Sequence, residues 1–133
     1  MKAKTWTVPA ERMKAGKAHV VPLADRALAI VEVMRQRATS DLIFAGDVED
    51  RPISDTAMTK ALRLASPDKA ATLHGLRSSF RDWAGDKTNF EEDVAEAALA
   101  HTIRDKTKAA YRRESALEKR RELMTAWEAY CNG

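Results

Sequence analysis

Four side chains in this sequence of 133 residues are of types that suit phosphoryl transfer. His74 and Arg77 stand three residues apart, and His101 precedes Tyr111 by ten residues. A phenol oxygen can attack phosphorus as a covalent nucleophile. An arginine binds the non-bridging phosphate oxygens with its planar fork, and histidines donate hydrogen bonds or exchange protons near neutral pH. The set therefore suits cutting and joining of a nucleic-acid backbone.

Each of these residues taken alone has a more ordinary interpretation. A lone histidine on a helix is usually structural, and a tyrosine in a basic stretch usually lies on the surface. Arg77 could simply pair with Asp82 or Asp86. Tyr130 is an internal comparison, and we expect it in the core or at an interface. It is the joint order and spacing of the set that favours the chemical interpretation.

Sequence patterns predict the elements that position these residues. Together they indicate a mainly helical α+β domain with a small antiparallel sheet near the N-terminus. Runs rich in β-branched residues at 4–8 and 19–23 predict a hairpin that ends at Pro22, and residues 41–44 predict a further short strand. Apolar residues at helical spacing predict helices over 24–37, 55–65, 73–85, 90–100, 106–113 and 115–130. His101 is then expected in the loop after a helix, and Tyr111 on the short helix beyond it.

Capping residues support these boundaries. Ser54 and Thr72 are predicted N-caps, and the spacing of a capping box occurs at Thr88 with Glu91, at Asn89 with Glu92, and at Ser115 with Glu118. Apolar residues share one face of each of two helices, Leu73, Leu76, Phe80 and Trp83 on one and Leu117, Met124, Trp127 and Cys131 on the last. Of these, Phe80, Trp83, Leu117, Met124 and Trp127 are interpreted as core.

Composition and charge set the limits of this interpretation. The chain is 44% hydrophobic and 32% charged, which favours a folded domain over disorder, and its net charge of +3 permits a nucleic-acid partner without requiring one. A single cysteine, Cys131, and the lack of any long apolar run predict a cytoplasmic protein with no membrane partner. His19, His74, His101 and Cys131 lack paired ligand spacing, so we expect no metal site. The sequence has no glycine-rich phosphate loop either, and we expect no cofactor.

Several strings together resemble the tyrosine recombinases. His74-Gly-Leu-Arg77, Leu99-Ala-His101 and Tyr111-Arg-Arg113 are similar to the His-x-x-Arg, Leu-Gly-His and tyrosine motifs of that family. Phage and prophage integrases of the P4 type also share strings much like Thr7-Val-Pro-Ala-Glu-Arg-Met-Lys14, Phe80-Arg-Asp-Trp83, Ala109-Ala-Tyr-Arg-Arg-Glu114 and Glu118-Lys-Arg-Arg121. The resemblance covers nearly the whole chain.

The resemblance implies a role for each residue of the set. Tyr111 would be the nucleophile that forms a 3′-phosphotyrosyl link, and Arg77 would clamp the phosphate. His74 would accept a proton, and His101 would hydrogen-bond the scissile phosphate. Lys14 would be the general acid for the leaving 5′-hydroxyl, with Lys17 as its rival. Further DNA contacts would come from the basic residues nearby, namely Arg12, Lys17, Arg104, Arg112 and Arg113.

The resemblance also implies partners and a missing part. The family's first arginine and its arm- and core-binding domains lie upstream, so residues 1–133 are expected to be one domain, the C-terminal catalytic portion of an integrase. Loss of one group that stabilises charge in the transition state, here the first arginine, raises the activation free energy by about 3 kcal/mol. We therefore expect the isolated chain to be a poor or inactive catalyst. Partners would be double-stranded attachment-site DNA and further copies, up to a tetramer. The alternatives are a catalytically incomplete DNA-binding or protein-interaction fragment and, with a poorer match of motifs, a type IB topoisomerase-like relative.

Overall fold

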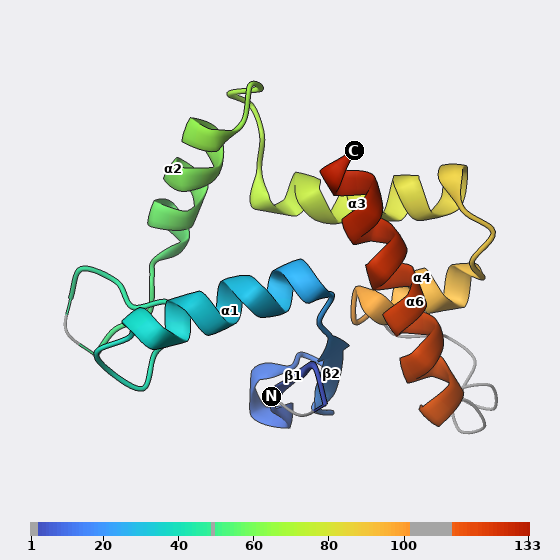
Figure 1. Cartoon of the computed structure of the whole chain (residues 1–133), viewed down its shortest axis with the longest axis horizontal. Coiled ribbons are helices and arrows are strands. Elements are labelled where there is room, and N and C mark those ends of the chain that lie inside the picture. Colours follow the sequence, from blue (N-terminus) through green and yellow to red (C-terminus); the bar gives the residue numbers. More distant parts are fainter. Residues whose placement is uncertain (1–2, 49, 102–112) are drawn as a thin grey trace. The chain divides into compact units, whose positions relative to one another are not determined.

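The computed structural model describes residues 3–48, 50–101 and 113–133 of the chain (Figure 1). Contacts between these residues divide the chain into two units, which are described separately. The first unit comprises Met1–Leu28 together with Arg81–Gly133, and the second comprises Ala29–Phe80. In the part of the chain described, no helix is both long and apolar enough to cross a membrane.

The first unit begins with a hairpin of two antiparallel strands, β1 (Thr5–Val8) and β2 (His19–Pro22). Thr5 pairs with Pro22 and Val8 with His19, and the strand ends at the proline because proline has no N–H to extend the ladder. A short 3-10 helix (Ala10–Arg12) and a tight turn at Gly16 close the hairpin. Gly16 has φ +61°, a conformation that glycine adopts without strain. The predicted hairpin is confirmed.

The core of the first unit is built where helices meet the hairpin. Helix α6 (Arg113–Asn132) packs against α4 (Glu92–Ala98) and against β2 (Figure 1). Leu123 of α6 is fully buried, and Val94 and Ala95 of α4 are buried as well. Burial of apolar area is the main favourable term in such packing.

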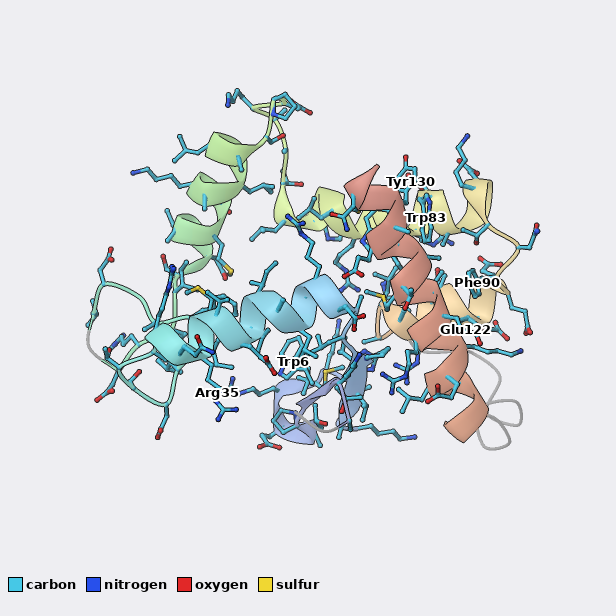
Figure 2. All side chains as sticks on the ribbon, in the orientation of Figure 1. Trp6, Arg35, Trp83, Phe90, Glu122 and Tyr130 are labelled. Carbon is cyan, nitrogen blue, oxygen red and sulfur yellow. The ribbon has the colours of Figure 1, made fainter. Side chains whose placement is uncertain are left out.

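An aromatic cluster joins α6 to the second half of α3 (Leu73–Lys87). The ring centroids of Trp83 and Trp127 lie 4.9 Å apart, and that of Tyr130 lies 5.7 Å from Trp83 (Figure 2). Trp83 is buried, whereas Tyr130 keeps 58% of its surface exposed. Tyr130 thus belongs to the margin of this cluster, and tilted rings at these separations add to the area they bury.

Polar contacts also fasten α6 to the hairpin. Arg120 donates from Nη1 to the carbonyl of Val20 at 2.8 Å, and burial lowers the pKa of its guanidinium. Burial and, second, the charge of Arg120 lower the pKa of His19, whose ring also bonds the backbone of Ala98. His19 is therefore neutral at neutral pH and serves the packing of β2, α4 and α6.

The second unit contains most of α1 (Asp25–Arg37), all of α2 (Asp55–Ala65) and the first half of α3. Its helices begin as predicted, since Ser54 Oγ accepts from the amide of Ala57 at 3.1 Å and Thr72 Oγ1 from that of Gly75 at 2.9 Å. Phe80, at its boundary, is buried, whereas several large apolar side chains remain exposed, namely Ile30, Val33, Phe44, Val48, Leu64 and Leu76.

Four local predictions are wrong. Residues 41–44 do not form a strand, because the pairing there is one isolated bridge, between Ala45 and Pro52. It is held by the bonds from the Ile53 amide to the Phe44 carbonyl and from the Gly46 amide to the Arg51 carbonyl, and the opposing segment ends at Ser54, the N-cap of α2. Helix α3 runs through Gly85 to Lys87. Neither predicted capping box forms at α4, where no side chain bonds the first turn.

Helix α6 differs from the prediction at its start, because its described part begins at Arg113 and places Ser115 inside the helix. Its buried residue is Leu123, which the predicted apolar stripe did not include, whereas Cys131, at the end of that stripe, is exposed. The helix predicted over 106–113 lies outside the described residues except for its last position. The α+β class itself is confirmed.

Candidate active site

The first turns of α3 present His74 and Arg77. Thr72 caps this helix, and a Cβ added at Gly75 would meet Thr72 Oγ1 at 3.1 Å, closer than nearly all such contacts. Glycine between the two site residues therefore leaves room for the cap. Residues three apart share a helix face, and both His74 and Arg77 are exposed. Helix α3 therefore carries both residues within the second unit, at the helical spacing that the sequence predicts.

The turn that follows α4 presents His101. Its amide donates to the carbonyl of Glu96 at 2.9 Å, and the amide of Ala100 donates to that of Ala97 at 3.2 Å. These two bonds form a Schellman motif, which requires a left-handed residue at the position of Ala100. Ala100 has φ +58°, although a glycine would adopt this conformation more readily. The backbone of the turn fixes where the His101 side chain leaves the helix.

Glu96 holds the ring of His101 and the side chain of Arg81 at the same time. His101 Nδ1 lies 2.5 Å from Glu96 Oε2, and Arg81 Nε donates to Glu96 Oε1 at 2.6 Å. Arg81 Nη2 also reaches Glu92 Oε1, at 3.3 Å. Hydrogen bonds from Arg81 and, second, from His101 lower the pKa of the Glu96 carboxyl, and the bond to Glu96 raises that of Arg81. Glu96 is therefore a carboxylate at neutral pH.

The hairpin loop presents three basic residues named from the sequence. Arg12 ends the 3-10 helix, and Lys14 and Lys17 flank the turn at Gly16. All three are exposed. A solvated cluster of this kind can approach a polyanion such as a nucleic-acid backbone.

The remaining predicted residues are not placed. Tyr111, Arg104 and Arg112 lie outside the described residues, and for Arg113 only the backbone is described. Of the predicted catalytic residues, four are described. His74 and Arg77 lie in the second unit, and Lys14 and His101 lie in the first.

Sequence reasoning missed the contribution of Glu96 and Arg81. A signal was present in both cases, since Glu96 precedes His101 by five residues and Arg81 lies inside the string Phe80-Arg-Asp-Trp83. The spacing alone did not indicate that both would meet on one carboxylate. In the described ranges, no three histidine, cysteine, aspartate or glutamate side chains gather as metal ligands would.

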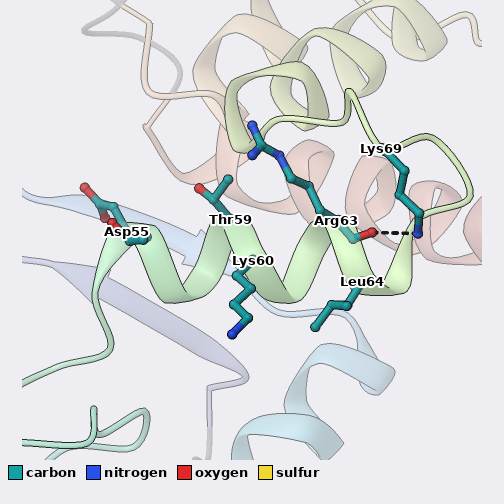
Figure 3. Close-up of a pocket in the computed structure, with 7 residues that line it drawn as sticks. Asp55, Thr59, Lys60, Arg63, Leu64 and Lys69 are labelled. Atoms are coloured by element: carbon teal, nitrogen blue, oxygen red, sulfur yellow. Dashed lines mark hydrogen bonds between the residues drawn. The ribbon is translucent and has the colours of Figure 1, made fainter.

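A cavity of about 570 Å³ lies along α2 (Figure 3). Its most basic wall is formed by Lys60, Arg63 and Lys69. Lys69 Nζ donates to the carbonyls of Arg63 and Ser66, both at 2.9 Å, and so stabilises the C-terminal end of α2. This lysine has a structural role, and the cavity contains none of the predicted catalytic residues.

Comparison with known proteins matches the chain to the phage integrase family over residues 1–118. Prophage integrase IntA of Escherichia coli K12 is 38% identical over 94% of the chain, which covers 30% of that relative. Prophage integrase IntZ of the same strain is 34% identical over 90% of the chain. The integrase of enterobacteria phage P4 is 29% identical over 94%, covering 32% of its own length. The chain thus spans about a third of these relatives, and no solved structure matches it significantly.

Proposed function

Because the chain belongs to the phage integrase family, we propose that it supplies most of the active site of a site-specific DNA recombinase, with Tyr111 as nucleophile. The observation that carries the proposal is the match over residues 1–118, a range that contains Lys14, His74, Arg77, His101 and Tyr111 in the predicted order. The activity is proposed for the complete gene product that carries this chain.

In the proposed reaction, the Tyr111 oxygen attacks a DNA phosphorus, and the bond from phosphorus to the 5′-oxygen breaks. His74 accepts the phenol proton, and Lys14 gives a proton to the departing 5′-oxygen. The products are a 3′-phosphotyrosyl link and a free 5′-hydroxyl. Attack by the 5′-hydroxyl of a second strand reverses the step, and the covalent link conserves the phosphoester energy, so no cofactor takes part.

Arg77 and His101 stabilise the charge that develops on the phosphate in this proposal. The planar guanidinium can bind two phosphate oxygens at once, and the imidazole can donate to one. The exposure of His74 and Arg77 on one face of α3 supports the assignment, because both must reach a large substrate. The basic hairpin loop supports an approach to the DNA backbone next to the cut.

The proposal extends to partners and location. The substrate is double-stranded DNA at two attachment sites, and exchange of two duplexes requires four cut strands, which fits self-association up to a tetramer on DNA. The reaction takes place where the chromosome is, in the bacterial cytoplasm. Both points follow from the proposed reaction.

A nicked duplex that releases a short 5′-hydroxyl strand after cleavage tests the proposal. The complete gene product should form a covalent adduct with a duplex carrying the junction between its genetic element and the chromosome. Tyr111→Phe should abolish the adduct, and Tyr130→Phe, the matched control, should keep it. Adduct formation by Tyr111→Phe would refute the assignment. Salt-dependent binding of this duplex without any adduct would favour a non-catalytic DNA-binding protein.

A further inference from the structure

We propose that Glu96 is a positioning residue that fixes the imidazole of His101, and that Arg81 in turn holds the Glu96 carboxylate in place. The inference rests on the proposed function, since it assigns how one residue of that active site is oriented. It also gives a role to Arg81 in the string Phe80-Arg-Asp-Trp83, which the proposed reaction leaves unused.

The geometry attaches His101 to Glu96 at two points. The His101 amide bonds the Glu96 carbonyl at 2.9 Å, and His101 Nδ1 lies 2.5 Å from Glu96 Oε2. The main-chain bond sets the position of the residue, and the side-chain bond sets the rotation of the ring. The ring nitrogen bonded to Glu96 is Nδ1, so a contact with a phosphate would be made by Nε2.

Arg81 makes the carboxylate itself a fixed group. Its Nε bonds Glu96 Oε1 at 2.6 Å, so each carboxylate oxygen has one close cationic or ring nitrogen. The Glu96 side chain is only 23% exposed, which limits the competition of water for these bonds. Arg81 leaves α3 two residues before Trp83, whose ring is fixed in the aromatic cluster with Trp127. The carboxylate is thereby tied to a rigid part of the first unit.

The contact with Glu96 determines which nitrogen of the His101 ring can bind the phosphate. The hydrogen bond made by one ring nitrogen determines which proton and which orientation the other nitrogen presents. With Nδ1–H donated to Glu96, only Nε2 can serve the phosphate. An imidazolium donates from both nitrogens, so the same ring can bond Glu96 and a phosphate oxygen together. The negative charge of the Glu96 carboxylate also balances the positive charge of the His101 imidazolium.

A double-mutant cycle on the complete gene product separates positioning from a general effect on folding. Glu96→Gln keeps the shape of the side chain and removes its charge. We expect it to slow adduct formation on the nicked junction duplex about tenfold, as loss of an orienting partner typically does. Glu92→Gln is the matched control, because Glu92 also contacts Arg81 but not His101, and it should change the rate less than twofold.

In the His101→Ala background, Glu96→Gln should have almost no further effect, because Glu96 acts through the ring. An equal slowing in both backgrounds would overturn the proposal. Nitrogen-15 NMR of the His101 ring, recorded on the chain without DNA, should show the Nδ1–H tautomer in the native sequence, because a carboxylate only accepts hydrogen bonds. A predominant Nε2–H tautomer in the native sequence would also overturn it. Absence of adduct from the unmutated gene product would instead remove the proposed function, and the NMR result would still report the Glu96 contact by itself.

Discussion

Ala100→Gly should stabilise the protein, because the left-handed position that ends a helix favours glycine. Ala100 has φ +58°, and the left-handed conformation costs an L-residue about 1–2 kcal/mol. Glycine removes this cost but gives the unfolded chain about 0.5–1 kcal/mol of additional entropy to lose. The expected net gain is about 0.7 kcal/mol in the free energy of unfolding.

The matched control is Ala97→Gly, one turn earlier in α4. There the backbone is helical, and glycine should cost about 1 kcal/mol relative to alanine. For a chain of 133 residues, the entropy of unfolding at the midpoint is about 0.28 kcal/mol/K. The two variants should therefore move Tm in opposite directions, up by about 2–3 °C for Ala100→Gly and down by about 3–4 °C for Ala97→Gly.

Thermal unfolding followed by far-ultraviolet circular dichroism at pH 7 measures both shifts. A fall in Tm for Ala100→Gly equal to that of Ala97→Gly would refute the reasoning, because it would mean that residue 100 is not left-handed. The turn at His101 would then lack the Schellman motif that directs its side chain. The experiment thus tests the backbone of the candidate site without requiring DNA.

Three further variants test the packing and the caps. Leu123→Ala should lower the free energy of unfolding, measured in urea, by about 2–5 kcal/mol, because Leu123 is fully buried. The control Leu64→Ala should change it little, because Leu64 is 74% exposed. Equal losses would contradict the core described. Thr72→Ala should cost about 1 kcal/mol through the lost cap of α3, and an unchanged urea midpoint would contradict it. The pKa of His19 is lowered on folding, so the unfolded chain binds its proton first, and stability should fall as the pH drops below about 6.5. His19→Gln should weaken that dependence of Tm on pH, and an unchanged slope would contradict the burial of His19.

Much of the fold could be predicted from short-range signals. The caps at Ser54 and Thr72, the hairpin ending at Pro22 and the period of the helices are local properties, and the structure confirms them. The prediction failed where a local signal had to compete with longer-range packing. Residues 41–44 have the composition of a strand, but the segment opposite them pairs only at Pro52 and then enters α2 at its N-cap, Ser54, so no ladder can extend.

The candidate site also combines features that local sequence predicts with contacts that depend on packing between helices. The pairing of His74 with Arg77 follows from helical spacing alone and was predictable. The Glu96 contacts with Arg81 and His101 depend on how α3 packs near α4, and a sequence pattern does not encode this packing explicitly. Lys14, Lys17 and Arg12 are exposed, as a loop composition indicates, but exposure by itself does not assign the general acid.

The most direct test of the central claim is to locate the DNA on the protein. The complete gene product is trapped on the nicked junction duplex, the adduct is digested with trypsin and nuclease, and tandem mass spectrometry identifies the residue that retains a nucleotide phosphate. We predict that the phosphate is on Tyr111. A phosphate on Tyr130, or on any serine or threonine, would contradict the account.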